Sequence, residues 1–166
     1  MWGSTTPNTA DECTWTNAPF NNGSSDYDET YFYSVKNTVC PNGILAKEYD
    51  AATQIMGGDW RMPTMADFDE LLRGTTNQWI ADYNGTGING RKFISKTDTS
   101  KYIFIPAAGS CHDGSVYNVG HSGYVCSSSL QTSYPNTDWY LTFGSDRCFM
   151  VNGNRYYGRS VRGVRK

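Results

Sequence analysis

From residue 91 onward, Gly, Ser, Asn and Asp interrupt the chain every few residues and separate short runs of β-like composition. These four residue types favour turns, because they tolerate unusual backbone conformations or form local hydrogen bonds with the main chain. The runs that we interpret as strands are 92–95, 102–107, 124–128, 139–143, 148–151 and 160–165. The C-terminal half is therefore expected to consist of short strands joined by turns.

The N-terminal part combines irregular sequence with one strand-like and one helix-like stretch. Residues 1–30 are rich in Asn, Thr, Ser, Gly and Asp and predict irregular structure. The alternating stretch 31–35 predicts a first strand. Apolar residues then recur at helical spacing across residues 45–56, directly before Gly57 and Gly58, which predicts a short helix ended by glycine.

A second helix is predicted to begin after Thr64. Thr64 is a good N-cap, and the side chain of Asp67, three residues later, can accept a hydrogen bond from the main chain of Thr64, which would complete a variant capping box. The apolar stripe of this helix consists of Met65, Phe68, Leu71 and Leu72. Capping explains the acidic residues Asp67, Asp69 and Glu70 without a metal or catalytic site. Two short helices followed by several short, mostly antiparallel strands indicate a loop-rich α+β fold.

Length and charge limit the classes of protein to which the chain can belong. A chain of 166 residues fits a single domain, 1–166, better than two. Its 14 Lys and Arg against 16 Asp and Glu give a formal charge of −2, so no global field attracts nucleic acid or an anionic membrane. No stretch approaches the roughly 20 apolar residues of a membrane span, and the first residues lack the pattern of a signal peptide. The absence of a heptad pattern favours a monomer.

Few side chains suit catalysis or metal binding. The two histidines, His112 and His121, belong to no metal-binding or catalytic motif, and no nucleophile elbow or phosphate-binding glycine loop is present. The five cysteines contain no C-x-x-C pair, and both a pairing such as Cys13 with Cys40 and a reduced set are admissible. We therefore expect no catalytic residues, no metal and no cofactor, with an enzyme of unrecognised site as the remaining alternative.

Positive charge collects near the C-terminus, where Arg155, Arg159 and Arg162 accompany Tyr156 and Tyr157. Arg and Tyr together can stack on and neutralise a nucleic-acid strand, but they are also typical of the hot spots of protein interfaces. Because the remainder of the chain is acidic, we expect a protein partner rather than nucleic acid.

Four motifs occur in one order along the chain: 57–64 (GGDWRMPT), 103–109 (IFIPAAG), 127–129 (SSS) and 155–165 (RYYGRSVRGVR). Together they resemble a family of bacterial, archaeal and phage domains with the C-type lectin fold, related in fold to the formylglycine-generating enzymes. The C-terminal arrangement is similar to the variable proteins of diversity-generating retroelements. In these, templated mutagenesis rewrites selected codons, mostly those for Asn, while the scaffold is retained. Known members include phage receptor-binding proteins and surface-displayed proteins.

The resemblance implies a candidate variable region at about residues 123–165. Within 139–143, alternation predicts that the odd positions point inward while Tyr140 and Thr142 face out. Cys126 stands where the family commonly has an aromatic residue, which is natural if its codon was diversified. The expected ligand-binding residues are Tyr124, Cys126, Tyr134, Thr137, Tyr140, Thr142, Gly144, Arg147, Phe149, Val151, Gly153, Tyr156, Tyr157 and Arg159.

These features predict a non-catalytic ligand-binding protein that recognises a cell-surface protein or another macromolecule, with a glycan as a less favoured ligand. Its expected location is extracellular, on a cell surface or on a virion. Neither a calcium-ligand motif nor the catalytic cysteine pair of the formylglycine-generating enzymes is recognisable, so the fold alone implies neither sugar binding nor catalysis. The alternative is a fixed-ligand surface adhesin or lipoprotein module of the same fold. Only a diversified protein requires a nearby reverse transcriptase and template repeat.

Overall fold

The computed structural model describes residues 1–165 and has the mixed α+β, loop-rich architecture that the sequence predicts. The α-helices are α1 (Glu29–Val39), α2 (Ala51–Met56) and α3 (Met65–Gly74). Single 3-10 turns are η1 (Pro41–Gly43), η2 (Lys47–Tyr49) and η3 (Tyr83–Gly85). The strands are β1 (Trp60–Arg61), β2 (Thr75–Ile80), β3 (Gly90–Ser95), β4 (Tyr102–Pro106), β5 (Ser110–His112), β6 (Ser115–Tyr117), β7 (Gly123–Leu130), β8 (Thr137–Phe143), β9 (Cys148–Asn154) and β10 (Val164–Arg165). Residues 1–28 contain no helix or strand.

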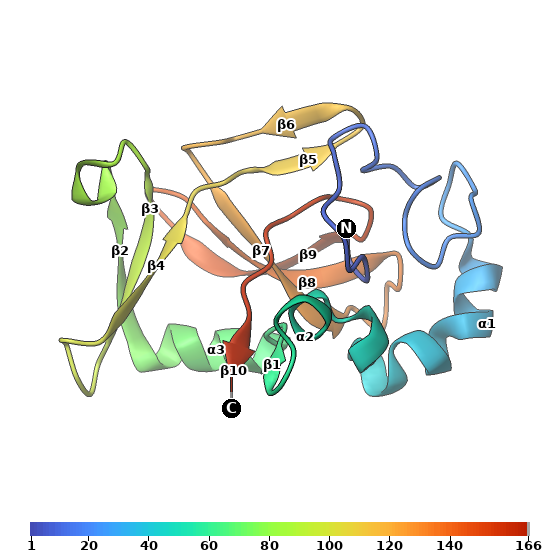
Figure 1. The fold of residues 1–166 in the computed structure, drawn as a ribbon, viewed down its shortest axis with the longest axis horizontal. Coiled ribbons are helices and arrows are strands. Elements are labelled where there is room, and N and C mark those ends of the chain that lie inside the picture. The colour runs from blue at the N-terminus through green and yellow to red at the C-terminus, as the bar shows by residue number, and fades with distance from the viewer. Residues whose placement is uncertain (166) are drawn as a thin grey trace.

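The strands form four small antiparallel sheets, in the orders β7-β8-β9, β2-β3-β4, β5-β6 and β1-β10. Figure 1 shows the β7-β8-β9 sheet in the middle, with the β2-β3-β4 sheet at one end of the molecule and α1 at the other. The β5-β6 hairpin lies above the central sheet in this view, and α3 lies below it. One face of the central sheet is therefore covered by a helix and the other is approached by a hairpin.

The short runs predicted in the C-terminal half are largely confirmed as strands. Four of them fall within β3, β7, β8 and β9, and the run 102–107 exceeds β4 by one residue, whereas only the end of the run 160–165 is a strand, β10. Strands β1, β2, β5 and β6 were not predicted. Strand β2 follows α3 directly at Thr75, where only Gly74 marks the change from helix to strand.

The stretch 31–35 is helical, so the prediction of a strand there was wrong and the fold has a third helix, α1. Asp28 caps this helix through a hydrogen bond of 2.8 Å from a main-chain N–H of its first turn. Phe32 and Val39 are buried, and Val35 packs against the same cluster. The helical spacing of these three residues outweighs the alternation of aromatic side chains that suggested a strand.

Capping residues define the start of the other two helices and the end of α2. Helix α2 starts only at Ala51, later than predicted, because the Asp50 carboxylate accepts a hydrogen bond of 2.9 Å from Thr53 N. It ends at Gly57, whose φ of 67° favours glycine. The predicted capping box of α3 is confirmed, since Thr64 and Asp67 exchange side-chain to main-chain hydrogen bonds in both directions.

Two apolar clusters form the core. The first joins the N-terminal segment, α1, α2 and the end of β7; its buried members are Trp2, Phe32, Val39, Cys40, Leu45, Ala51, Ala52, Met62, Cys126 and Leu130. The second joins α3 to β3, β4 and the central sheet; its buried members are Phe68, Phe93, Ile105, Ala107, Val125, Leu141 and Phe143. The face of the central sheet that is turned toward α3 is thus part of the core.

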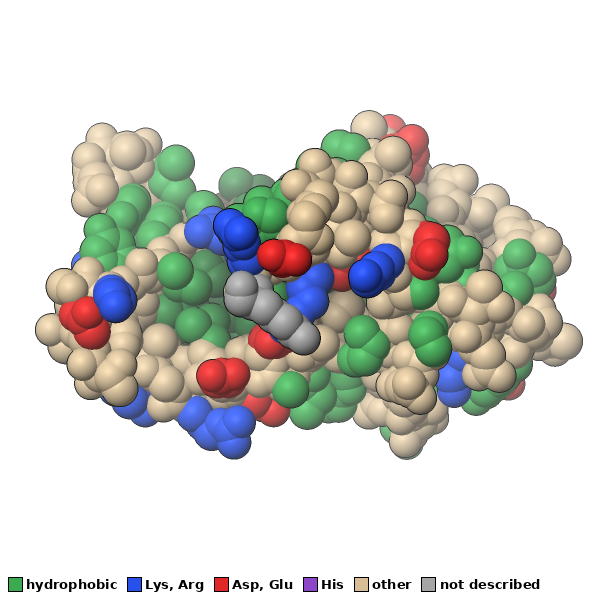
Figure 2. Space-filling view, turned by 60° about the horizontal axis from the view of Figure 1, so that its bottom comes forward, with side chains coloured by type: hydrophobic (Ala, Val, Ile, Leu, Met, Phe, Trp, Pro, Cys, Tyr) green, Lys and Arg blue, Asp and Glu red, His purple; other side chains and the backbone are tan. Residues whose placement is uncertain are grey.

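The side of the molecule that carries α3 is hollowed where helix and sheet do not close completely. Figure 2 shows hydrophobic side chains gathered in this hollow. Its volume is about 380 Å³, and Phe68, Leu71, Ile103 and Ile105 are among the residues that line it. None of the helices in the described part of the chain combines the length and the apolar sequence needed to cross a membrane.

Candidate ligand-binding face

The central sheet carries a row of predicted site residues on the face turned away from α3. Tyr124 on β7 pairs with Thr142 on β8, and Thr142 pairs with Phe149 on β9. Two residues along, Tyr140 pairs with Val151. Directly paired residues share a face of a sheet, as do residues two apart along a strand. We call the surface formed by Tyr124, Tyr140, Thr142, Phe149 and Val151 the outer face.

The alternation predicted within 139–143 is confirmed at four of its five positions. Leu141 and Phe143 are buried in the second core cluster, while Tyr140 and Thr142 are partly exposed. Trp139 was expected to point inward, but it is only partly buried. The period of two therefore separates side chains that support the core from side chains that reach the surface.

Three predicted tyrosines converge on one hollow of about 300 Å³, which we call the tyrosine hollow. Tyr124 comes from β7, Tyr140 from β8, and Tyr157 from the segment that follows β9. The remaining lining residues are Ser110, His112, Tyr117, Asn118 and Arg159. The hollow thus joins the outer face to the β5-β6 hairpin.

The ring of His112 lies between two tyrosine rings in this hollow. Its centroid is 4.4 Å from that of Tyr117 and 4.3 Å from that of Tyr157, and both pairs of planes are within 15° of parallel. Asp113 holds the imidazole through a contact of 3.1 Å between its Oδ2 and His112 Nδ1. Asn118 donates a hydrogen bond of 2.9 Å to the Tyr124 hydroxyl. The aromatic walls of the hollow are therefore fixed by stacking and hydrogen bonds.

Sequence reasoning missed His112, Tyr117 and Asn118 as members of the site. The dipeptide Asp113-Gly114 is a strong hairpin signal, and β5 and β6 flank it directly. Recognition of this turn would have placed His112 close to Tyr117. Nothing in the sequence indicates that the hairpin lies over the central sheet.

A second hollow of about 410 Å³ adjoins the first and shares Tyr124 with it. It contains four more of the predicted residues, Thr142, Gly144, Arg147 and Phe149. Phe149 is 41% exposed, and the side chain of Arg147 is 73% exposed. Arg147 forms a solvent-exposed ion pair with Asp146 at 3.7 Å. An exposed aromatic ring beside an exposed guanidinium is a combination typical of interface hot spots.

Arg159, which was predicted to contact a ligand, lines the tyrosine hollow, but its side chain is almost fully buried and supports the outer face from beneath. Its side chain is 1% exposed, and its Nη1 donates to Asp138 Oδ1 at 2.7 Å. Its Nη2 donates to the Asn154 carbonyl at 3.0 Å. The guanidinium lies 3.9 Å from the centroid of the Tyr140 ring, so Arg159 sets the position of a residue of the face. Burial raises the pKa of the Tyr140 phenol, which therefore keeps its proton.

Cys126 and Tyr156 are likewise not surface residues. Cys126 is 1% exposed within the first core cluster, and burial raises the pKa of its thiol to about 11. Tyr156 is 9% exposed; its ring packs against Trp15 and its hydroxyl donates to Asp113 Oδ2 at 3.2 Å. Both predictions fail for the same reason, since segments distant in sequence cover these side chains.

The remaining predicted residues lie at the margins. Tyr134 is 65% exposed in the loop between β7 and β8, and Thr137 donates to its carbonyl at 2.8 Å. Neither lines either hollow. At Gly153 an added Cβ would lie 3.0 Å from Arg159 Nη2 and 3.1 Å from the Tyr140 ring, so only a small residue fits without displacing them.

Among residues 1–165, no group of three or more His, Cys, Asp or Glu side chains is arranged to hold a metal ion. Comparisons of the chain with protein-family models, with curated proteins and with solved structures give no match. The assignment of a function therefore depends on the geometry of the two hollows and of the outer face.

Proposed function

We propose that this chain is a non-catalytic binding protein that recognises a cell-surface protein or another macromolecule through the outer face and the tyrosine hollow. The convergence of Tyr124, Tyr140 and Tyr157 on one hollow supports the proposal most strongly. Tyrosine offers a large contact area at a low cost in conformational entropy, and its hydroxyl adapts to polar partners. A partner is therefore expected to bury these rings.

The size of the hollows favours a macromolecular ligand. Hollows of about 300 and 410 Å³ lie in the lower part of the range typical of small-molecule sites, and both are open. Each can receive one projecting side chain or one sugar ring, while Phe149 and Arg147 contact the surface around it. The outer face thus suits a protein partner that inserts one or two side chains.

Diversification of the outer face is part of the same proposal. A surface whose side chains change needs positions that do not support the core, and Thr142, Phe149 and Val151 meet this condition. The α+β architecture is compatible with the C-type lectin fold that the sequence resembles. An extracellular, cell-surface or virion location follows from this function.

Binding of the labelled full chain to a panel of intact bacterial cells, measured by flow cytometry, tests the proposal. Tyr124→Ala combined with Tyr157→Ala is expected to reduce binding at least tenfold, because buried aromatic anchors typically contribute about 2 kcal/mol or more. Tyr33→Ala is the matched control, since Tyr33 is 50% exposed on α1, outside both hollows, and its loss is expected to leave binding unchanged.

Treatment of the cells distinguishes the two ligand classes. Protease treatment is expected to abolish binding and periodate oxidation of glycans to preserve it, whereas the reverse result would assign a glycan ligand. Undiminished binding by the folded double variant would overturn the proposed site, and absence of binding to every cell in the panel would count against a cell-surface ligand.

A further inference from the structure

The sulfur atoms of Cys13 and Cys111 are 3.0 Å apart, although the two residues are 98 positions apart in the sequence. Non-bonded carbon atoms prefer about 3.5–4.0 Å, and sulfur is larger than carbon, so this contact is close for two separate thiols. A disulfide bond is about 2.05 Å long, so an approach of about 1 Å would join them. The other cysteines lie elsewhere: Cys40 and Cys126 belong to the first core cluster, and Cys148 packs against the second.

Main-chain hydrogen bonds hold both cysteines in place. Asp113 N donates to Cys13 O at 3.0 Å, which ties the N-terminal segment to the β5-β6 turn. Cys111 and Gly158 exchange two main-chain hydrogen bonds of 2.8 Å each. These bonds fix the backbones of both cysteines, so the path of three chain segments brings the two side chains together.

Gly158 leaves the space that the sulfur pair occupies. A Cβ at this position would collide with the sulfurs of both Cys13 and Cys111. The backbone of Gly158 has no positive φ, so conformational freedom does not account for a glycine here. The space requirement does, and it links the glycine directly to the sulfur pair.

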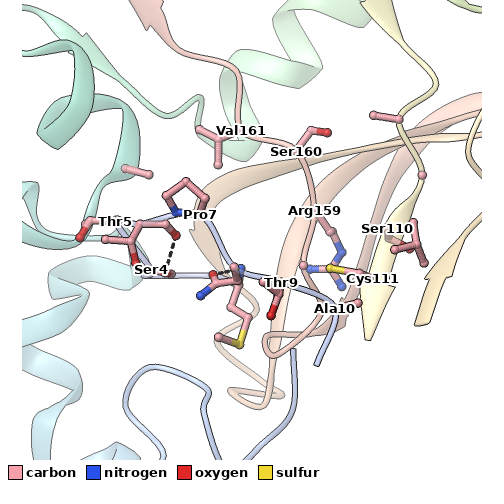
Figure 3. A pocket seen from close by; sticks show the side chains of 18 of the residues that line it. Ser4, Thr5, Pro7, Thr9, Ala10, Ser110, Cys111, Arg159, Ser160 and Val161 are labelled. Carbon is pink, nitrogen blue, oxygen red and sulfur yellow. Dashed lines mark hydrogen bonds between the residues drawn. The ribbon is translucent and has the colours of Figure 1, made fainter. Parts of the chain in front are cut away.

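The two thiols differ in access to solvent. Cys13 is fully buried, whereas Cys111 lines an open pocket of about 560 Å³ between the N-terminal segment and the C-terminal segment 158–161. Figure 3 shows Cys111 among the side chains of this pocket. A small oxidant can therefore reach Cys111 first.

We propose that Cys13 and Cys111 are a cross-linking site that closes to a disulfide by exchange with a low-molecular-weight disulfide. The Cys111 thiolate attacks one sulfur of the reagent and releases one small thiol, which leaves a mixed disulfide at Cys111. The Cys13 thiolate then attacks the Cys111 sulfur and releases the second small thiol. In total, two cysteine thiols and one reagent disulfide become one protein disulfide and two small thiols.

The cross-link would connect the irregular N-terminal segment to strand β5, one residue before His112 of the tyrosine hollow. Such bonds persist in oxidising surroundings outside cells. The cross-link involves only the two cysteines and the space at Gly158, so its formation does not require the proposed ligand.

Thiol counting on the full chain after incubation with glutathione disulfide tests the proposal. After alkylation under denaturing conditions, mass spectrometry is expected to find three alkylated thiols, that is five cysteines minus two. Peptide mapping is expected to give one linked peptide that contains Cys13 and Cys111. The oxidised chain should also melt roughly 10 °C above the reduced chain, because the bond closes a long loop.

Variants separate this pair from the other thiols. Cys111→Ser is expected to lose the linked peptide and the rise in Tm, whereas Cys148→Ala should keep both, with two alkylated thiols remaining. Gly158→Ala should slow closure by pushing the sulfurs apart. Five alkylated thiols in the treated wild-type chain, or a linked peptide that joins Cys13 to Cys40, would overturn the assignment.

Discussion

Replacement of Arg159 by alanine tests whether the ion pair beneath the outer face organises this part of the fold. The side chains of Arg159 and Asp138 are 1% and 0% exposed, and the substitution removes hydrogen bonds to Asp138 and to the Asn154 carbonyl. It also removes the group stacked on Tyr140. Loss of one partner of a buried pair typically costs about 3–5 kcal/mol, because the other charge is left without compensation. For a domain of this size, that corresponds to a fall in Tm of roughly 10 °C.

The loss of stability should depend on pH in a defined direction. Burial raises the pKa of Asp138, and the attraction of Arg159 opposes this shift. Without Arg159 the folded-state pKa of Asp138 rises further above the unfolded value of about 3.9. A group with a raised folded-state pKa contributes stability at low pH and loses it as the pH rises. The cost of Arg159→Ala should therefore be larger at pH 8 than at pH 5.

Urea unfolding followed by tryptophan fluorescence measures this cost at both pH values. Arg147→Ala is the matched control, because the Arg147 side chain is 73% exposed, and its effect should stay below about 0.5 kcal/mol. The loss of stability in Arg159→Lys should lie between those of Arg159→Ala and Arg147→Ala, since lysine keeps the charge but not the planar guanidinium with its several donors. A loss below about 1 kcal/mol for Arg159→Ala would refute the reasoning that this pair supports the face.

Two further substitutions, Asp67→Ala and Leu141→Ala, test the fold by equilibrium unfolding, with Thr142→Ala as a control. Asp67→Ala removes the capping box and the bonds of 2.6 and 2.8 Å from Arg61, so we expect a loss of about 1–2 kcal/mol at pH 7. Hydrogen bonds from Arg61 hold the pKa of Asp67 below its usual range. The contribution of Asp67 to stability is therefore fully present above about pH 4 and is lost as the pH falls. A loss of stability at pH 2 equal to that at pH 7 would contradict this account. Leu141→Ala should lower the free energy of unfolding by about 2–5 kcal/mol, because Leu141 is fully buried. Thr142→Ala, on the outer face, should lower it by less than about 0.5 kcal/mol. Similar losses for both variants would contradict the assignment of the two faces.

Local signals were sufficient to predict much of the fold. The capping box at Thr64 and Asp67 involves residues three apart, and the alternation of Leu141 and Phe143 with Tyr140 and Thr142 lies within one strand. Such patterns depend on backbone geometry alone, so they are readable from the sequence. The stretch 31–35 was wrongly predicted to be a strand, because its aromatic alternation competes with a helical pattern that extends to Val39.

The candidate site was predictable only in part. Tyr124, Tyr140 and Tyr157 were recognised individually, but their convergence on one hollow depends on how β7, β8 and the segment after β9 meet. Arg159 was taken for a surface residue because its partner, Asp138, lies 21 positions earlier in the chain. Cys126 was misplaced for a similar reason, since the sequence does not reveal which segment covers it.

The sequence of the genomic DNA around this gene tests most directly whether the outer face is a diversified recognition surface. The account predicts a near-copy of codons 123–165 and a reverse-transcriptase gene close by. The copy should differ at adenines in codons of the outer face, such as those for Tyr124, Thr142 and Phe149, and should match at the buried Leu141 and Phe143. A copy whose differences fall on buried positions would contradict the account. Absence of both the copy and the reverse transcriptase would also contradict it and favour the fixed-ligand adhesin.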